Sequence, residues 1–148
     1  MLDRRVPPPA HVWGDLGIAR DDLADGIGHL RVLVADEDAG ILRLLTEILS
    51  DDFEVTTARN GREAVELAAT SQPDLVMLDL GMPIVDGFVA CRLIRASDPD
   101  VPIVILSGRT DSLSLRTAFE AGASDYLTKP FTVSVLRSRL RANLLRSR

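Results

Sequence analysis

The chain has 148 residues, enough for one domain of ordinary size with a short extension. Apolar residues make up 46% of it and aromatic residues only 4%, which predicts an aliphatic core, and no apolar run approaches the roughly 20 residues of a membrane span. The net charge of −5 is uneven, because residues 31–131 hold nine basic and seventeen acidic side chains whereas residues 132–148 hold five arginines and no acid. With no signal-peptide pattern at the start, we expect a cytoplasmic protein.

Residues 1–29 differ in pattern from the rest of the chain. Three consecutive prolines, Pro7–Pro9, forbid regular helix or sheet, and several glycines follow. The simpler interpretation is a flexible N-terminal extension. A second interpretation stays open, a short helix docked on the domain and lined by Leu16, Leu23, Ile27 and Leu30. We expect the folded domain to cover residues 30–148.

From Arg31 onward, short apolar runs alternate with helical patterns. The expected strands are Arg31–Ala35, Phe53–Thr57, Leu75–Leu78, Ile103–Leu106 and Tyr126–Leu127. The expected helices run through Ile41–Leu49, from Asn60-Gly61 through Leu67, over about Asp86–Ala96, over Asp111–Ala121 with a stop at Gly122, and over 132–146. Such an order predicts an α/β fold, a doubly wound five-stranded parallel sheet with helices on both faces. The lone Cys91 falls in the apolar pattern of the third helix, so we expect it to be buried.

Polar residues follow four of the five predicted strands. The first strand runs into Asp36 and Glu37, the third into Asp79 and the fourth into Ser107, and Lys129 comes just after the fifth. The carboxyl ends of parallel strands meet at one edge of the sheet, where such folds bind their ligands. Crowded carboxylates repel one another unless a cation lies among them, and a hard ion with oxygen ligands, Mg²⁺, suits a sparse, open site.

Lys129 is the only lysine among seventeen basic residues, and the other sixteen are arginines. Lysine carries a compact point charge, whereas arginine presents a wide planar fork, so a lone lysine suits an anion held in a tight pocket. A carboxylate such as Asp79 beside a divalent cation and an ammonium can attack a phosphoryl group and form an acyl phosphate. These residues therefore indicate a phosphoryl-transfer site.

Together these motifs resemble the receiver domain of two-component response regulators, the CheY-like family with a flavodoxin-like fold, over about residues 31–146. The matching motifs are Asp36-Glu37, Leu78–Pro83 with Asp86-Gly87, Ser107-Gly108, and Lys129-Pro130-Phe131. In that order they are similar to the family's acidic pair, its phosphoacceptor strand and loop, its hydroxyl residue, and its lysine with a cis-peptide proline. All the signature elements are present and in order.

The resemblance implies which residues take part in the chemistry. Asp79 would be the phosphorylated residue. Mg²⁺ would be held by Asp36, Glu37, Asp79 and the backbone carbonyl of Gly81. Glu37 departs from the commonest pattern, in which this acid is an aspartate, and lengthens the arm to the metal.

The same resemblance implies a switch. Lys129 and Ser107 would be the catalytic side chains that contact the phosphoryl oxygens. Tyr126, the only tyrosine, would turn inward when Ser107 moves. The domain would thus catalyse only its own phosphorylation and dephosphorylation, with a sensor histidine kinase or a phosphotransfer protein as the phosphoryl donor.

A partner or dimer surface is expected on the fourth helix, fifth strand and fifth helix. The positions where DNA-binding relatives pair a base with an acid align with Leu115 and Val135, both apolar, which puts that ion pair in doubt. Asp125 and Arg139 are candidates for another contact of the same dimer. Nucleic acid would be bound only through an output domain outside this sequence. Because the chain stops at the fifth helix, docking to partners and a downstream effector domain both remain open.

Two other functions compete with a phosphorylated receiver. One is a receiver-like interaction module that no longer takes phosphate, although all the site residues are present. The other is a phosphatase of the haloacid-dehalogenase type, whose first motif Asp36-Glu37-Asp38 superficially matches. That interpretation leaves Asp79 unexplained and lacks an acidic pair after Lys129.

Overall fold

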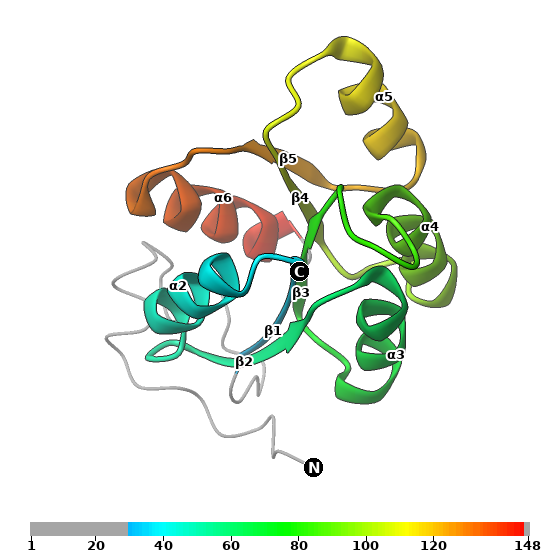
Figure 1. Cartoon of the computed structure of the whole chain (residues 1–148). Coiled ribbons are helices and arrows are strands. Elements are labelled where there is room, and N and C mark those ends of the chain that lie inside the picture. Colours follow the sequence, from blue (N-terminus) through cyan, green and yellow to red (C-terminus); the bar gives the residue numbers. More distant parts are fainter. Residues whose placement is uncertain (1–29, 147–148) are drawn as a thin grey trace.

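Five parallel strands form a central sheet in the order β2-β1-β3-β4-β5 (Figure 1). The structure is a computed structural model that describes residues 30–146, so the N-terminal extension lies outside the described residues. The strands are β1 (Leu30–Ala35), β2 (Phe53–Ala58), β3 (Leu75–Asp79), β4 (Ile103–Ser107) and β5 (Asp125–Thr128). The helices are α2 (Ala39–Leu49), α3 (Gly61–Ser71), α4 (Gly87–Ser97), α5 (Ser112–Glu120) and α6 (Val133–Arg146). The predicted doubly wound α/β fold is confirmed.

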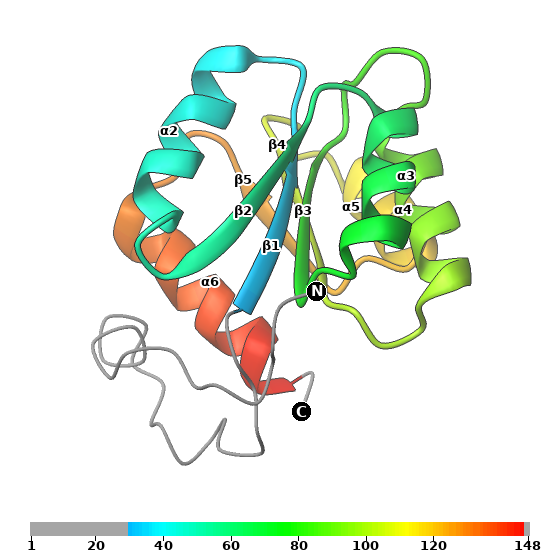
Figure 2. The same cartoon turned by 90° about the horizontal axis from the view of Figure 1, so that it is seen from below.

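Helices cover both faces of the sheet, with α2 and α6 on one side and α3, α4 and α5 on the other (Figure 2). Alternate residues of each central strand supply the two cores. Val32 and Val34 of β1 pack in the core with α2 and α6, whereas Leu33 and Ala35 pack in the core with the other three helices. Central strands buried on both faces explain the uninterrupted apolar runs of the sequence.

Residues at the helix ends are of types that suit the local backbone, either by accepting hydrogen bonds from free N–H groups or by adopting a positive φ. Asp86 and Asp111 accept hydrogen bonds from backbone N–H groups at the starts of α4 and α5. Gly122, one residue beyond the end cap of α5, has a φ of 111°, as predicted for a glycine stop. Cys91 is fully buried, and burial raises the pKa of its thiol to about 11, so it is a core residue as expected.

The order of the strands in the sheet determines where a ligand-binding crevice can form. β1 lies between β2 and β3, and its residue Ala35 pairs with Ala58 on one side and Leu78 on the other. The chain therefore reverses its winding direction between β1 and β3, and a crevice forms at the carboxyl ends of strands on either side of such a point. Asp36 follows β1 directly, and Asp79 is the last residue of β3.

The loop between β3 and α4 contains a strained residue. Ile84 has a φ of 71°, a conformation that β-branched side chains avoid, and the N–H of Val85 donates to the carbonyl of Pro83 at 2.8 Å to close a three-residue turn around it. Its side chain is 75% exposed and so gains little from packing.

We expect Ile84→Gly to stabilise the domain, because glycine adopts positive φ without a steric cost. Such strain costs about 1–3 kcal/mol, and the greater freedom of glycine in the unfolded chain offsets about 0.4–1 kcal/mol of the gain. Urea unfolding measures the difference. Ile84→Val, which keeps the branched Cβ, is the control and should match the parent; a glycine variant no more stable than the valine variant would contradict this explanation.

Candidate functional site

The ammonium of Lys129 lies between two carboxylates from different strands. Its Nζ donates to Asp36 Oδ2 at 2.7 Å and to Asp79 Oδ1 at 3.1 Å. Asp36 is 1% exposed, and its Oδ1 accepts a hydrogen bond from the N–H of Asp38 at 2.9 Å. The lysine is held at its own backbone, where its N–H donates to the carbonyl of Ser107 at 2.8 Å. Residues separated by up to 93 positions thus meet at one edge of the sheet.

The two carboxylates keep Lys129 charged. Burial by itself would lower the pKa of its ammonium, but the hydrogen bonds to Asp36 and Asp79, together with their negative charges, outweigh burial and raise the pKa. The stabilisation from these pairs is therefore fully present at neutral pH and is lost only as the pH rises through the raised pKa. One ammonium between two carboxylates leaves the cluster with a net negative charge, which favours a cation.

The oxygen donors at this edge suit Mg²⁺ but do not form a closed cage. Asp36 and Asp79 come together, whereas Glu37 is exposed, and its carbonyl accepts a 3.5 Å hydrogen bond from Arg59 Nη2. Within residues 30–146, no three acidic, cysteine or histidine side chains are grouped as a metal site. A Cβ added to Gly81 would lie 3.8 Å from Asp79 Oδ2, so the Gly81 backbone borders the carboxylate. Two carboxylates with a neighbouring backbone segment fit an ion that keeps several of its waters.

Ser107 and Tyr126 are linked through the backbone of one residue. The N–H of Arg109 donates to Ser107 Oγ at 3.0 Å, and the hydroxyl of Tyr126 donates to the carbonyl of Arg109 at 2.7 Å. Tyr126 is half-buried on β5, and Ser107 is buried at the end of β4. The Ser107 and Tyr126 side chains therefore bond the N–H and the carbonyl of the same residue. Sequence reasoning named both side chains but not this link, because a backbone contact leaves no signal in the residue types.

A buried polar network ties β5 to α6. Asn143 is 1% exposed, and its Nδ2 donates to Asp125 Oδ2 at 3.0 Å and to the carbonyl of Arg139 at 2.8 Å. Arg139 Nη1 lies 3.5 Å from Asp125 Oδ1 within the same chain. Asp125 and Arg139, proposed from the sequence as a dimer contact, thus pair internally here. The buried Asn143 was missed, although it stands directly before Leu144 in the apolar pattern of the last helix.

The predicted partner surface is partly apolar. Val135 of α6 is 43% exposed, Leu113 of α5 is 62% exposed, and Leu115 is half-buried. Neither Leu115 nor Val135 can form an ion pair.

Every helix in residues 30–146 is too short or too polar to cross a bilayer.

Three comparisons with known proteins relate this chain to one family. A family described as "Response regulator receiver domain" matches residues 32–141. The chain is 44% identical over 120 residues to response regulator MprA of Mycolicibacterium vanbaalenii, covering 80% of this chain and 52% of MprA. It is 43% identical over 122 residues to transcriptional regulatory protein PrrA of Mycobacterium tuberculosis, covering 82% of this chain and 52% of PrrA. The chain therefore spans about half the length of these curated relatives.

A solved structure extends the likeness to three dimensions. The chemotaxis protein CheY4 of Vibrio cholerae superimposes with a TM-score of 0.74 at 29% identity, covering 78% of this chain and 98% of that chain. Because the family match covers residues 32–141, the haloacid-dehalogenase interpretation is excluded. With its five-stranded sheet and the acidic edge described above, this chain belongs to the response regulator receiver domain family of two-component signal transduction.

Proposed function

We propose that Asp79 accepts a phosphoryl group from a sensor histidine kinase or phosphotransfer protein, and that the phosphorylated domain alters its contacts with partners. The observation that carries this proposal is the Lys129 ammonium bonded to both Asp36 and Asp79 at the edge of the sheet. A carboxylate oxygen of Asp79 attacks the phosphorus, the bond from phosphorus to the donor's imidazole nitrogen breaks, and that nitrogen takes the electron pair. The domain is then a signalling domain that catalyses only its own phosphorylation and dephosphorylation.

The surrounding residues serve the phosphoryl group. Asp36, Glu37, Asp79 and the carbonyl of Gly81 would hold Mg²⁺, which when bound neutralises charge on the phosphoryl oxygens. Lys129 leaves Asp79 Oδ1 to contact a phosphoryl oxygen while keeping its bond to Asp36.

The response starts from the fourth strand. Ser107 turns its hydroxyl toward the phosphoryl group, and the Arg109 backbone that it shares with Tyr126 moves with it. The partly apolar surface of α5, β5 and α6 changes as a result, and it is the candidate surface for partners or a second copy.

The wider setting of the domain is also proposed. The receiver domain covers residues 30–148 after an extension over 1–29, in a cytoplasmic protein. The relatives MprA and PrrA are named as regulators, PrrA as a transcriptional one, and about half of each lies beyond the match. We propose that this chain likewise acts through a regulatory output, either a partner or an effector domain, and contacts nucleic acid only through the latter.

The test is phosphorylation by a small donor. With Mg²⁺ and acetyl phosphate, intact-mass spectrometry should show a single phosphoryl adduct, and fragmentation should place it on Asp79. Chelation of Mg²⁺ by EDTA should abolish the adduct. A parent protein that takes no phosphoryl group would favour the interaction module, and an adduct on another residue would overturn the assignment.

Lys129→Arg should keep the fold but lose most of the response to phosphorylation. The ammonium bonds two carboxylates at 2.7 and 3.1 Å from a side chain only 24% exposed, and a wide planar guanidinium fits such a space poorly. Acyl-phosphate yield should fall less than the response, because the bound metal ion still neutralises charge. Mg²⁺ affinity by calorimetry, adduct mass and phosphorylation-dependent light scattering should be measured side by side.

The control for this variant is Arg141→Lys, an exchange of the same two residue types on the exposed face of α6. It should behave as the parent in all three measurements. If Lys129→Arg does so too, the single lysine has no special role.

A further inference from the structure

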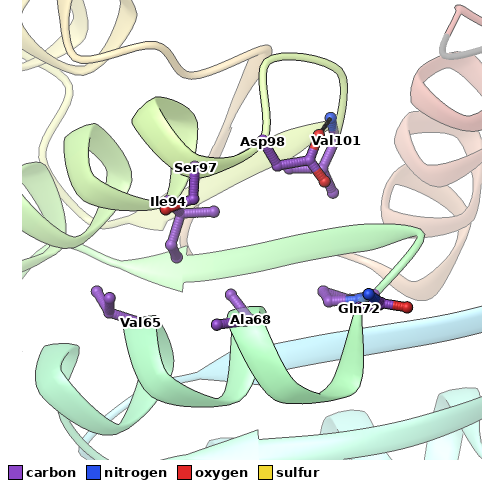
Figure 3. A pocket seen from close by; sticks show the side chains of 9 residues that line it. Val65, Ala68, Gln72, Ile94, Ser97, Asp98 and Val101 are labelled. Carbon is purple, nitrogen blue, oxygen red and sulfur yellow. Dashed lines mark hydrogen bonds between the residues drawn. The ribbon is translucent and has the colours of Figure 1, made fainter.

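A cavity of about 360 Å³ lies between the C-terminal halves of α3 and α4. Its walls include Pro73, just before β3, and Val101, just before β4, so it lies at the opposite edge of the sheet from Asp79. Figure 3 shows Ala68 of α3 facing Ile94 of α4 across it. The cavity is therefore separate from the phosphoacceptor edge.

The volume and the floor of the cavity suit an aromatic ring system. An engineered apolar cavity of about 150 Å³ binds benzene, and small-molecule pockets begin at roughly 300 Å³. The space between α3 and α4 thus exceeds what one six-membered ring requires. Pro73, Ile94 and Val101 are buried and apolar, so they offer a ring an apolar surface to pack against.

One end of the cavity presents a carboxylate. Gln72 and Asp98 lie at this end, where α3 and α4 both finish (Figure 3). Asp98 Oδ1 accepts hydrogen bonds from the N–H groups of residues 100 and 101 at 3.0 and 3.1 Å, which holds the side chain against the backbone. Its Oδ2 accepts none from any residue between 30 and 146. The carboxylate is therefore positioned and keeps one oxygen for a ligand.

The same end of the cavity has a net negative charge. Among the described residues, Asp74, Asp98 and Asp100 lie at or next to its lining, together with the guanidiniums of Arg31 and Arg95. Arg31 Nη1 donates to the carbonyl of the last residue of α3 at 2.9 Å, and Arg95 Nη1 donates to the carbonyl of Asp98 at 3.1 Å. Three carboxylates thus outnumber two guanidiniums, and the C-terminal ends of the two helices add partial negative charge. This end favours a cation over an anion.

We propose that the cavity binds an aromatic amine, a ligand with one or two fused rings and a protonated amino group on a short chain. The ring lies between α3 and α4 on the apolar floor, and the ammonium donates to Asp98 Oδ2. Such a charge-assisted hydrogen bond is stronger than one from a neutral donor, so the carboxylate selects the amine over an alcohol of the same shape. Binding at this edge requires no phosphoryl group on Asp79.

Three probes with the same indole ring test the proposal on the full, unphosphorylated chain. Tryptamine carries an ammonium, tryptophol a hydroxyl and indole-3-acetate a carboxylate on the side chain. In calorimetric titrations to millimolar concentration we expect tryptamine to bind, tryptophol to bind severalfold more weakly, and indole-3-acetate to give no measurable binding. A parent that does not bind tryptamine, or that binds all three probes equally, would overturn the proposal.

Asp98→Asn tests the ammonium contact, because it removes the charge but keeps an oxygen for the two backbone N–H groups. It should weaken tryptamine binding severalfold and leave tryptophol binding nearly unchanged. The matched control is Asp86→Asn at the other end of α4, which should change neither. Unchanged tryptamine binding in Asp98→Asn, or an equal loss of both probes, would contradict the assignment of Asp98.

Filling the cavity from either helix, with Ala68→Phe or Ser97→Phe, should abolish the binding of both probes. Two opposed filling variants keep the test valid if one of them fails to fold, which circular dichroism reports. Thr70→Phe on α3 and Ala96→Phe on α4 add the same ring at exposed residues that do not line the cavity, and should bind tryptamine as the parent does. Binding that survives both filling variants would place the ligand elsewhere on the molecule and overturn the proposal.

Discussion

Asp79→Asn should abolish phosphorylation by acetyl phosphate while leaving the domain folded. An amide oxygen is a poor nucleophile, so the substitution removes the attacking group without changing the shape of the side chain. Lys129 keeps its 2.7 Å bond to the buried Asp36, so the ammonium is not left without a partner. Because the parent cluster has two carboxylates for one ammonium, loss of one negative charge also relieves repulsion. We therefore expect a midpoint of thermal unfolding equal to or above that of the parent.

The control for this substitution is Asp86→Asn, on the loop that follows the same strand. Asp86 accepts a hydrogen bond from the N–H of Val89 at 3.0 Å at the start of α4, and asparagine caps helices about as well as aspartate. This variant should take up one phosphoryl group as the parent does. An adduct of parent yield in Asp79→Asn, or its loss in Asp86→Asn alone, would contradict the assignment of the acceptor.

Gly87→Ala should be strongly destabilising. A Cβ at this first residue of α4 would lie 2.3 Å from the carbonyl oxygen of Asp79 and 2.6 Å from the Cα of Leu80, both backbone atoms that cannot rotate away. Either α4 or the end of β3 must shift, and the cost should reach the upper end of the range for overpacking, about 3 kcal/mol. Urea unfolding monitored by circular dichroism measures this loss.

Gly108→Ala provides the comparison, because a Cβ there would meet nothing within 4 Å. Its stability should stay within about 0.5 kcal/mol of the parent, as for surface substitutions away from special features. Since the clash at Gly87 involves the backbone of Asp79, the Gly87 variant should also take up phosphoryl groups more slowly. Equal stability of the two alanine variants would show that α4 moves away without cost.

The helices and strands of this fold could be predicted because the sequence pattern that indicates each one lies within or next to that element. The uninterrupted run Leu75–Leu78 indicates a strand buried on both faces, and Gly122 marks a helix end. Strand ends also placed Asp36, Asp79 and Lys129 at one edge, where the structure joins them by hydrogen bonds. The metal and phosphorylation roles of these residues remain predictions.

Contacts that depend on three-dimensional placement could not be read from the sequence. The positive φ of Ile84 is imposed by the loop around it, against the preference of the residue itself. The hydrogen bonds between Tyr126 and Arg109 and between Asn143 and Asp125 join segments 17 and 18 residues apart, and nothing in either segment specifies the other. The cavity between α3 and α4 likewise arises from how two helices pack.

The long sequence separations within the Asp36–Lys129–Asp79 cluster affect the order of events during synthesis. Lys129 lies 93 residues after Asp36 and 50 after Asp79, so a nascent chain that ends before β5 has both acids without their ammonium. Contacts between such distant residues form later than local structure, because bringing the two segments together costs loop-closure entropy. A partly made domain therefore lacks the ammonium that joins Asp36 to Asp79 even when β3 has formed, and almost the whole domain must leave the ribosome before this cluster is complete.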